Sequence, residues 1–600
     1  MTHYAAPQRD MRFVIHELVG LEPMRHLPGF NELDTSLVDA VIDEAGKFAA
    51  KVLAPLNCTG DRQGARWQDT RVTVPEGFSD AYRQFVEAGW LGLSCDPALG
   101  GQGLPRLVGA AVQEIWKSAN HAWSICQALT LGGVEALLAN GSLSQQEQYL
   151  PALISGGWTA TMNLTEPQAG SDLSQVRARA VPQADGRYRI FGQKIFISFG
   201  EHDMSENILH FVLARTPDAP EGTRGVSLFL VPKFLPDSRG YPGERNDVYC
   251  LGIEHKLGLH GSPTCVMTYG EHGGALGELV GREHEGLKCM FTMMNSGRVS
   301  AGLEGLGVAE RAYQQAVAYA RQRLQGRAPG NPAEAVPIVG HPDVRRMLML
   351  MRSYIDAMRA LCYWAAALQD MAAHHTDPRE RKRYSTLADL MTPVVKGWCT
   401  EVGFDIAHLG IQVHGGTGYV EETGASQYLR DVRISSIYEG TTGIQANDLI
   451  GRKVVRDGGA TIRFVLAEMQ RSALELDAHE ASTHGPTLRR IRDALLGGID
   501  ALAGAVDHVL ERTDRDPRGV AVGAVPFLHL TGIVCGGWMV ARAAGLAAQR
   551  LAQDGNDAFY TGKIATACFY AEHVLPHAHA HAHAACAGDS CAFDIAEESL

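Results

Sequence analysis

The sequence predicts an α+β protein of several domains, in which helical blocks flank a central β-rich block. With 600 residues, the chain exceeds the size at which one hydrophobic core keeps growing, so several packed units are expected. Apolar residues follow helical spacing at first, then short β-like runs, then helical spacing again. We therefore expect a helical domain at 1–157, a β domain at 158–280, a helical bundle at 281–455 and a further helical domain at 456–600.

The N-terminal block has helical apolar spacing with one clear interruption. Leu33–Leu53 has the period of a helix, and Asp34-Thr35-Ser36 supplies candidates for its N-cap. Glycine and proline at residues 100–105 predict a loop. His121–Leu138 is largely apolar, which indicates a buried helix.

Residues 158–280 contain short apolar or alternating runs that are separated by glycine and proline. Such runs predict the strands of a small barrel or sandwich. A first strand is expected at Thr159–Leu164, and further strands at residues 188–191, 194–197, 208–213 and 226–231.

Helical periodicity resumes after residue 286. Three helices are expected at Leu287–Arg323, His341–His375 and Lys382–Leu409, and an Ala- and Leu-rich helical block at residues 461–573, with loops at 514–517 and 555–557. Histidine and alanine then alternate in His577–His583. Four histidines can bind a metal, but no Cys or carboxylate flanks them, so we expect a frayed tail and no metal site.

Composition excludes several classes of function. The 45% hydrophobic and 20% charged residues are ordinary for a globular protein, and the net charge of −13 argues against nucleic acid as the main partner. No apolar run reaches the roughly 18–20 residues of a membrane span, and residues 1–10 lack a signal-peptide pattern. The 12 cysteines form no CxxC pair, which indicates reduced thiols in a cytoplasmic protein.

A hydroxyl-rich loop, Thr165–Asp172, follows the first expected strand. Its small residues and hydroxyls can place N–H and O–H donors against a polar heterocycle or a pyrophosphate. The alternative is an ordinary capped turn in which Ser171-Asp172 starts a helix.

A second block, Gly192–Gly200, contains Phe196 and Ser198 two positions apart on an expected strand. Regular alternation would place the ring and the hydroxyl on one face, where they could stack on and hydrogen-bond a planar cofactor. The alternative is a strand with a buried phenylalanine.

Two further blocks suggest recognition of phosphate or adenine. Asn295 and Arg298 lie three apart in the long expected helix, hence on one face, and arginine suits such ligands, although a solvated arginine is the alternative. Gln412–Tyr419 is rich in glycine and is similar to a phosphate-cradling loop.

One carboxylate, Glu439, follows the apolar pair Ile437-Tyr438 and precedes Gly440. Apolar surroundings raise the pKa of a carboxylate towards working pH, which suits a general base. The glycine lets peptide N–H groups come close to a ligand. For this segment alone, the alternative is a buried glutamate at a helix N-terminus.

Taken together and in this order, these blocks resemble the acyl-CoA dehydrogenase family over roughly residues 30 to 455. The resemblance implies a helical N-terminal domain, a central β-barrel or sandwich and a C-terminal four-helix bundle. The length, the N-terminal Asp10–Val14 and the extra helical block are similar to the large bacterial subgroup, which includes 3-(methylthio)propanoyl-CoA dehydrogenase-like and long-chain acyl-CoA dehydrogenase-like enzymes.

The resemblance implies FAD as cofactor and assigns residues to it and to the substrate. Flavin contacts would come from Leu164, Thr165, Phe196 and Ser198, and phosphate contacts of FAD or CoA from Ser171. Arg323, Gln412 and Gly416 would bind the adenosine diphosphate end of FAD of the neighbouring subunit, with Thr441 as a further FAD contact. Asn295, Arg298, Tyr438 and Gly440 would contact the CoA substrate.

Departures from the family pattern affect some of these contacts. Asn295 stands where Asp is frequent, Gly443 where Gln is frequent, and Gln325-Gly326-Arg327 replaces the usual Thr-Phe-Gly. These departures weaken the FAD assignments around 323–327 and 443.

The resemblance also implies the reaction. Glu439 would take the α-proton of an acyl-CoA and a hydride would pass from the β-carbon to flavin N5, giving a trans-2-enoyl-CoA. Its backbone N–H and a ribityl hydroxyl would hold the thioester oxygen. Family members with the base on the long helix would have it at Gly297, which has no side chain.

A fatty acyl-CoA of medium to long chain or 3-(methylthio)propanoyl-CoA is the implied substrate, and fatty-acid β-oxidation the implied process. An electron-transfer flavoprotein would accept the electrons, and the protein would be a homodimer without stable membrane insertion. Alternatives are a flavin oxidase that uses oxygen and a non-catalytic flavoprotein scaffold.

Overall fold

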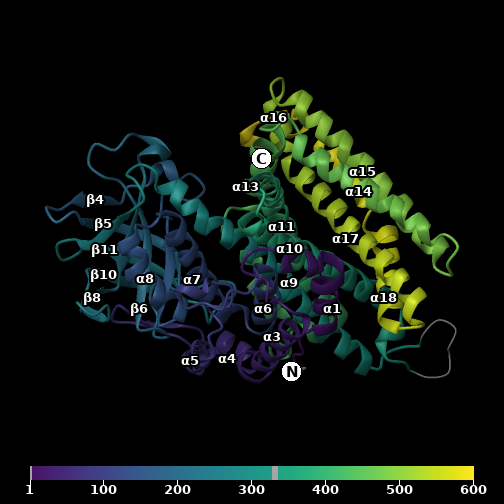
Figure 1. The fold of residues 1–600 in the computed structure, drawn as a ribbon, viewed down its shortest axis with the longest axis horizontal. Helices are drawn as coiled ribbons and strands as arrows, with labels where there is room; N and C mark the ends of the chain where they lie inside the picture. Colours follow the sequence, from purple (N-terminus) through teal and green to yellow (C-terminus); the bar gives the residue numbers. More distant parts are fainter. Residues whose placement is uncertain (1–2, 328–334) are drawn as a thin grey trace. The chain divides into compact units, whose positions relative to one another are not determined.

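The computed structural model describes residues 3–327 and 335–600, and Figure 1 shows the order of their elements. The chain forms two compact units. The bundle unit comprises Met1–Glu44, Arg106–Glu114 and Ala301–Leu600, and the β unit comprises Ala45–Pro105 and Ile115–Ser300.

A mixed sheet with strand order β10-β11-β5-β12-β7-β6-β3 forms the centre of the β unit. Its strands are β3 (Trp158–Asn163), β4 (Arg179–Pro182), β5 (Tyr188–Ser198), β6 (Asn207–Ala214), β7 (Ser227–Pro232), β10 (Val248–Ile253), β11 (Thr264–Tyr269) and β12 (Ala275–Val280). β3 pairs with β6 in parallel, and the other strand pairs are antiparallel. The β-rich domain expected from the sequence is therefore confirmed.

Strand β5 connects two parts of this sheet. Its first residues pair with β12 and β4, and its last residues pair with β11. The sequence suggested two strands here, but Gly192 continues the ladder opposite Tyr269, so a single 11-residue strand forms. Two small hairpins complete the strands: β1 (Arg66–Gln68) with β2 (Arg71–Thr73), and β8 (Phe234–Pro236) with β9 (Pro242–Arg245).

Helices of the N-terminal half surround this sheet or belong to the bundle unit. They are α1 (Gln8–Arg12), α2 (Glu22–Arg25), α3 (Thr35–Phe48), α4 (Ala54–Gln63), α5 (Phe78–Glu87), α6 (Arg106–Ala119), α7 (His121–Asn140) and α8 (Leu143–Ser155), with π-helical turns at Phe13–Gly20 and Ala49–Leu53. Asp34 caps α3 as expected, because its carboxylate accepts the Leu37 N–H at 2.7 Å. Residues 101–105 form a loop, also as expected.

The bundle unit is built on three long helices, α9 (Gly286–Gln322), α10 (Pro342–His374) and α11 (Pro378–His414), of which α9 begins in the β unit. Two short helices follow, α12 (Ala425–Val432) and α13 (Thr442–Asp448). At Gly305 on α9, a Cβ would lie 2.2 Å from the Cys399 carbonyl oxygen of α11. Only glycine therefore permits this close helix crossing.

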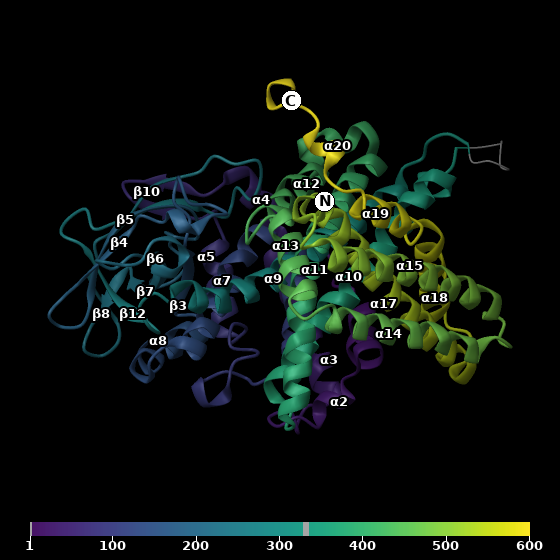
Figure 2. The same cartoon turned by 90° about the horizontal axis from the view of Figure 1, so that it is seen from above.

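The C-terminal block forms the rest of the bundle unit, with π-helical Leu449–Val455 leading into it. Its helices are α14 (Ala460–Glu475), α15 (Gly485–Arg512), α16 (Pro517–Val522), α17 (Ala524–Asp554), α18 (Ala558–His573), α19 (His577–Ala585) and α20 (Ser590–Phe593). Figures 1 and 2 show α15 and α18 alongside the apolar α17. The expected loop at 555–557 lies between α17 and α18, and the loop expected at 514–517 ends one residue earlier, because Pro517 begins α16.

The expectation of a frayed histidine-rich tail is wrong. Residues His577–Ala585 form helix α19, which packs against α15 and α17. Ala578 and Ala585 are buried in this contact, and the His581 ring stacks on His529 with 5.3 Å between centroids. A helix with small side chains can pack closely, which the low-complexity pattern did not reveal.

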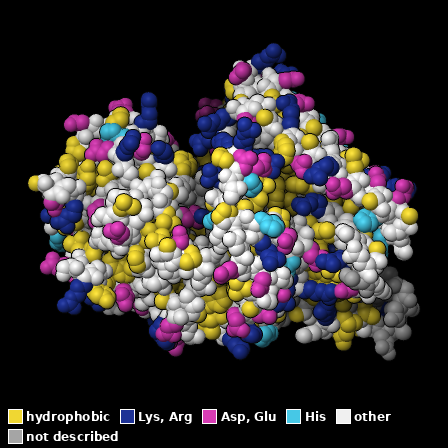
Figure 3. Space-filling model, viewed as in Figure 1, with side chains coloured by type: hydrophobic (Ala, Val, Ile, Leu, Met, Phe, Trp, Pro, Cys, Tyr) yellow, Lys and Arg dark blue, Asp and Glu magenta, His cyan; other side chains and the backbone are white. Residues whose placement is uncertain are grey.

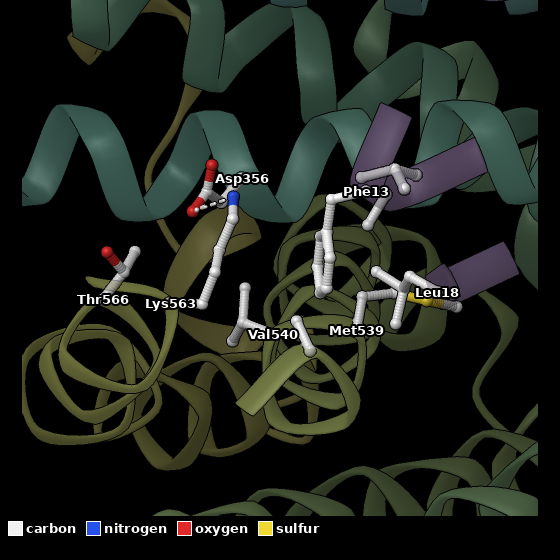
Figure 4. A pocket seen from close by; sticks show the side chains of 10 residues that line it. Phe13, Leu18, Asp356, Met539, Val540, Lys563 and Thr566 are labelled. Atoms are coloured by element: carbon white, nitrogen blue, oxygen red, sulfur yellow. Dashed lines mark hydrogen bonds and ion pairs between the residues drawn. The ribbon is translucent and has the colours of Figure 1, made fainter. Parts of the chain in front are cut away.

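The N-terminal segment of the chain packs against the C-terminal block around a small cavity, drawn in Figure 4. Its volume is about 10 Å³, room for about one water molecule. Lys563 of α18 binds Asp356 of α10 at 3.0 Å and also Asp10 of α1, and its ammonium lies 5.5 Å from the Phe13 ring centroid. The first and last parts of the chain thus share one core.

Two helices, α7 and residues Ala524–Gln553 of α17, are long and apolar enough to cross a membrane. This finding corrects the expectation that no apolar stretch reaches that length. The protein itself buries 67% of the apolar window in α7 and 83% of that in α17. Core helices of globular domains pass the same test of length and composition. On the face shown in Figure 3, side chains of both charges are mixed with apolar ones.

Candidate functional site

Glu439 lies in a turn between a 3-10 helix, Arg433–Ser436, and the start of α13. Its φ angle is +56°, and that of Gly440 is +87°. A left-handed conformation is unfavourable for a residue with a Cβ, so the surroundings must impose it on Glu439. At Gly440 a side chain is excluded, because a Cβ would lie 2.8 Å from Gln445 Nε2.

Two buried side chains hold the carbonyl groups of this turn. Lys396 Nζ on α11 donates to the Gly440 oxygen at 2.7 Å. Gln445 Nε2 on α13 donates to the Glu439 oxygen at 3.1 Å and to the Gly440 oxygen at 3.2 Å. Lys396 and Gln445 are fully buried. The backbone of the turn is therefore tied to two helices.

The neighbours of Glu439 along the chain are also fixed. The Tyr438 hydroxyl donates to the Glu304 carboxylate of α9, and burial together with Glu304 raises the pKa of Tyr438 well above its ordinary value. Thr441 is the N-cap of α13, since its hydroxyl oxygen accepts the Ile444 N–H at 3.3 Å. Glu439 itself is half-buried. The alternative of a buried glutamate at a helix N-terminus is therefore met only in part, because Glu439 is half-buried and helix α13 starts three residues later, at Thr442.

In the β unit, the loop with Leu164 and Thr165 is tied to strand β5. Lys194 Nζ donates to the Leu164 oxygen at 3.0 Å and forms a buried ion pair with Glu166 at 2.8 Å. The Ile195 N–H donates to the Thr165 oxygen at 2.9 Å. Burial lowers the pKa of Lys194 to about 8, although Glu166 opposes that shift. These bonds place Thr165 beside the Phe196 segment.

Phe196 lies at a bulge, which the alternation argument did not foresee. The register with β11 shifts between Cys265 and Met267, and the φ angle of Phe196 is +59°. The bulge turns the ring outwards, so that 59% of Phe196 is exposed. The alternative of a buried phenylalanine is wrong. Ser198 is half-buried, and its carbonyl accepts the Thr161 hydroxyl at 2.8 Å.

The loop around Ser171 contains a capped turn. Asp172 accepts the Ser174 N–H at 2.9 Å and caps a 3-10 turn, Leu173–Gln175, rather than an α-helix. Ser171 is exposed beside it. The capping alternative is thus confirmed for Asp172, and the Ser171 hydroxyl remains a candidate ligand contact.

Asn295 and Arg298 share one face of α9, as expected from their spacing. Arg298 Nη1 lies 3.4 Å from Asn295 Oδ1, and its guanidinium carbon lies 5.7 Å from the Phe291 ring centroid. Arg298 is only 4% exposed. The alternative of a solvated arginine is therefore wrong.

The last turns of α9, which precede Arg323, contact the glycine-rich loop in the bundle unit through Tyr319. Tyr319, one turn before Arg323, stacks on His414 with 4.5 Å between ring centroids and lies 3.4 Å from the Thr417 hydroxyl. Arg323, Gln412 and Gly416 are all exposed, and a Cβ at Gly416 would meet nothing within 4 Å. The loop itself is a 3-10 turn, Gly415–Tyr419.

The candidate residues thus form four groups, two in each unit. The β unit contains Leu164, Thr165, Ser171, Phe196 and Ser198 on strand β5 and in the loop after β3, and Asn295 and Arg298 on α9. The bundle unit contains Tyr438, Glu439, Gly440 and Thr441 in one turn, and Arg323, Gln412 and Gly416 at another place. No group of three or more His, Cys, Asp or Glu suited to a metal ion occurs within residues 3–327 and 335–600.

Sequence reasoning missed Lys396, Gln445 and the Lys194–Glu166 pair. One signal was present: Lys396 is the only charged residue between Leu390 and Thr400, a largely apolar stretch of α11. A lysine in such a setting is buried, and a buried ammonium requires partners.

Four family models match the chain in succession. They are the acyl-CoA dehydrogenase N-terminal domain at residues 37–157, the middle domain at 161–270, the C-terminal domain at 284–454 and the acetyl-CoA dehydrogenase C-terminal-like domain at 465–596. Together these models account for most of the chain.

Individual proteins match over nearly the full length. The chain is 48% identical to 3-methylmercaptopropionyl-CoA dehydrogenase of Ruegeria pomeroyi, over 95% of this chain and 96% of the relative. It is 35% identical to the broad-specificity linear acyl-CoA dehydrogenase FadE5 of Mycobacterium tuberculosis, over 96% of each. Its fold is similar to that of an acyl-CoA dehydrogenase from Bacillus anthracis solved with FAD, with a TM-score of 0.71 at 20% identity, covering 96% of this chain and 91% of that one. These matches, together with the ordered motifs and the fold, show that the chain belongs to the acyl-CoA dehydrogenase family.

Proposed function

We propose that this protein oxidises an acyl-CoA thioester to a trans-2-enoyl-CoA, with FAD as cofactor and Glu439 as the base that takes the α-proton. The observation that carries the proposal is the left-handed turn at Glu439 and Gly440, whose carbonyls are held by Lys396 and Gln445. A strained backbone held by several buried donors is typical of a functional site. Membership of the family supports the same reaction.

The residues of the turn have different roles in proton removal. The Glu439 carboxylate accepts the proton from the α-carbon of the acyl group. The Glu439 backbone N–H donates to the thioester oxygen and so stabilises the negative charge that develops there. Tyr438 stays neutral, because its raised pKa keeps the hydroxyl protonated. It adds no second charge beside the base.

The donor set of the β unit fits a flavin. The exposed Phe196 ring offers a flat apolar surface, and Ser198 and Thr165 offer polar groups on the neighbouring backbone. FAD, when bound, supplies the hydride acceptor for the β-carbon of the substrate. Leu164, Thr165, Phe196 and Ser198 would hold its ring system, and Thr441 would be a further FAD contact.

Different residues are candidates for binding the phosphate-bearing ends of CoA and of FAD. Ser171, Asn295 and Arg298 would contact the CoA substrate, with Tyr438 and Gly440 beside its thioester. Arg323, Gln412 and Gly416 are exposed and would bind the adenosine diphosphate part of FAD held by a second copy of the chain. Arginine and open glycine backbone suit a diphosphate.

For the substrate we propose a linear fatty acyl-CoA of medium to long chain or 3-(methylthio)propanoyl-CoA. The 48% identical relative is a 3-methylmercaptopropionyl-CoA dehydrogenase, and the 35% identical one has broad specificity for linear acyl-CoAs. A panel of acyl-CoAs from short to long, together with the thioether substrate and an artificial electron acceptor, would rank them by kcat/KM.

We further propose four domains with boundaries near residues 157, 280 and 455; the succession of four matched family models supports this division. Because the sequence has no CxxC pair, reduced flavin would pass its electrons to an electron-transfer flavoprotein. Stoichiometric peroxide formation at full rate would favour an oxidase instead.

The place of action would be the cytoplasm, without membrane insertion, since the two apolar helices are mostly buried.

The test of this proposal is the variant Glu439→Gln. It removes the base but keeps the size of the side chain, so turnover should fall by about 100- to 10,000-fold while the fold and the bound flavin remain. Glu421→Gln is the matched control, because Glu421 is exposed and pairs only with Arg430 among the ion pairs of the described chain. Turnover of Glu439→Gln within about tenfold of wild type would reject Glu439 as the base.

A further inference from the structure

The carbonyl groups of Glu439 and Gly440 point into the protein, where two helices meet them. Lys396 belongs to α11 and Gln445 to α13. The adjoining Gly397 permits this approach, because a Cβ there would lie 3.4 Å from the Gln445 Cβ and 2.5 Å from Leu528 Cδ2 of α17. Three helices therefore converge beneath the turn.

We propose that Lys396 and Gln445 are positioning residues that set the direction of the base. This inference rests on the proposed role of Glu439. The Lys396 ammonium and the Gln445 carboxamide hold the two peptide planes of the turn in the left-handed conformation, and they act on the reaction only through Glu439.

The geometry of the peptide group explains how this positioning works. In a trans peptide the C=O and N–H groups point in opposite directions. Once Lys396 and Gln445 hold the carbonyls of Glu439 and Gly440 on one side, the N–H groups of Gly440 and Thr441 point to the other side. The same restraint fixes the Cα–Cβ bond of Glu439, and hence the direction of its carboxylate.

Without these donors the turn has a lower-energy alternative. A non-glycine residue prefers negative φ, so Glu439 would relax from +56° towards the right-handed region. Such a rotation of more than 100° would carry the carboxylate away from its position. A charged donor is stronger than a neutral one, so Lys396 has the larger share and Gln445 the smaller.

Gln445 has a further property that fits this role. Its Oε1 atom is buried and has no hydrogen-bond partner among the residues that the structure describes. The side chain therefore satisfies two carbonyls of the turn while one of its own polar atoms remains unpaired. A glutamine kept only for the stability of α13 would be expected to use both ends.

The experiment compares Lys396→Met with Lys563→Met, both of which replace a buried lysine by a neutral chain of similar length. Lys563 binds the carboxylates of Asp10 and Asp356 and no atom of the turn. We measure kcat per bound flavin, KM and the isotope effect on kcat with α-deuterated 3-(methylthio)propanoyl-CoA. Normalisation to flavin removes any loss of folded protein.

For Lys396→Met we expect kcat to fall by about 100-fold with little change in KM, because a misplaced reacting group costs about that much. The α-deuterium isotope effect should rise, since proton abstraction becomes more fully rate-limiting. Lys563→Met should lower thermal stability but leave kcat per flavin and the isotope effect unchanged. Lys396→Arg, which keeps a charged donor, should restore a substantial part of the activity.

A double variant separates action through the base from any other effect. On the Glu439→Gln background, Lys396→Met should change kcat by less than about threefold, because the residue that it positions is already inactive. Gln445→Met should show the same pattern with a smaller loss, about tenfold, and it serves as the test if Lys396→Met does not bind flavin.

Two results would overturn the inference. One is a Lys396→Met or Gln445→Met enzyme with wild-type kcat per flavin and an unchanged isotope effect. The other is a full further loss of activity on the Glu439→Gln background. If instead Glu439→Gln alone is as active as wild type, the base assignment fails; if Glu439→Gln is inactive and the Lys396 and Gln445 variants are normal, only the positioning role fails.

Discussion

Arg359 of α10 and Glu114 of α6 form a charge pair in the interior of the bundle unit. Arg359 Nη2 lies 2.7 Å and Nε 3.0 Å from Oε1 of Glu114, and the two side chains are at most 2% exposed. Arg359 also binds Glu310 of α9 at 2.8 Å, and the Tyr363 hydroxyl donates to Glu114 at 2.7 Å. One guanidinium thus joins three helices of the bundle.

Replacing Arg359 by methionine should destabilise the protein strongly, because Glu114 and Glu310 would remain buried without their cation. We expect a loss of about 3–5 kcal/mol in the free energy of unfolding, measured by denaturant titration followed by far-UV circular dichroism. The exposed pair Arg346–Asp343 is the control, and Arg346→Met should cost at most about 1 kcal/mol. Adding Glu114→Leu to Arg359→Met should recover part of the loss, and a double variant that is less stable than the single one would contradict this account.

Asp370 should make stability depend on pH near neutrality. Its carboxylate accepts the N–H groups of Arg106 and Leu107 at 2.9 and 3.0 Å, at the start of α6, and burial raises its pKa from 3.8 to about 7. Between these values the folded state binds a proton that the unfolded state has lost, so the stabilisation is present at low pH and is lost as pH rises through about 7. Thermal midpoints should therefore fall from pH 5 to pH 8, and Asp370→Asn should reduce this slope. An identical slope in wild type and variant would show that Asp370 does not titrate in this range.

The purified protein should be yellow and should release FAD, rather than FMN, on denaturation. Phe196→Ala should weaken FAD binding by about 3- to 10-fold in a fluorescence titration of the apoprotein, since an aromatic contact contributes about that much. Tyr241→Ala is a suitable control, because Tyr241 is another exposed aromatic residue of the β unit, 63% accessible in the turn between β8 and β9. Equal binding by the Phe196 variant and wild type would remove Phe196 from the flavin site.

Light scattering should give about twice the chain mass of 64.8 kDa, that is, a homodimer. The expected cofactor contacts Arg323, Gln412 and Gly416 stand beside exposed apolar residues, Leu324 at 57% and Tyr419 at 87%. Such apolar exposure is typical of a surface that pairs with another molecule. Leu324→Asp combined with Tyr419→Asp should give a monomer that loses FAD more easily. A dominant tetramer would contradict the prediction of a homodimer.

The sequence predicted the long helices closely and the strands less well. Leu287–Arg323 was expected and Gly286–Gln322 is found, because apolar periodicity over ten turns leaves little choice of bounds. Strand β5 differs, since the bulge at Phe196 depends on its pairing with β11, a segment about 70 residues later in the chain. The packing of α19 depends in the same way on α15 and α17.

In the candidate site, too, local sequence indicated some residues, whereas others depend on contacts with distant parts of the chain. The local pattern made Glu439 a candidate, and the resemblance of the ordered motifs to the family made it the expected base. The donors to its backbone were not identified, since Lys396 stands 44 residues before Gly440 and meets it only in the folded bundle. Local patterns thus indicate candidate groups, whereas tertiary packing decides which side chains contact the backbone around them.

The ion pair between Asp10 and Lys563 joins residues that are 553 positions apart in the sequence. During synthesis at about 5–20 residues per second, α1 leaves the ribosome roughly 30–110 seconds before its partner on α18 exists. For that time the buried side chains of Met11, Phe13 and Ile15 have no C-terminal helices to cover them. The N-terminal segment can therefore bury these side chains only after the C-terminal helices have been synthesised. A chain terminated before α17 would leave that apolar surface open to chaperones or to aggregation.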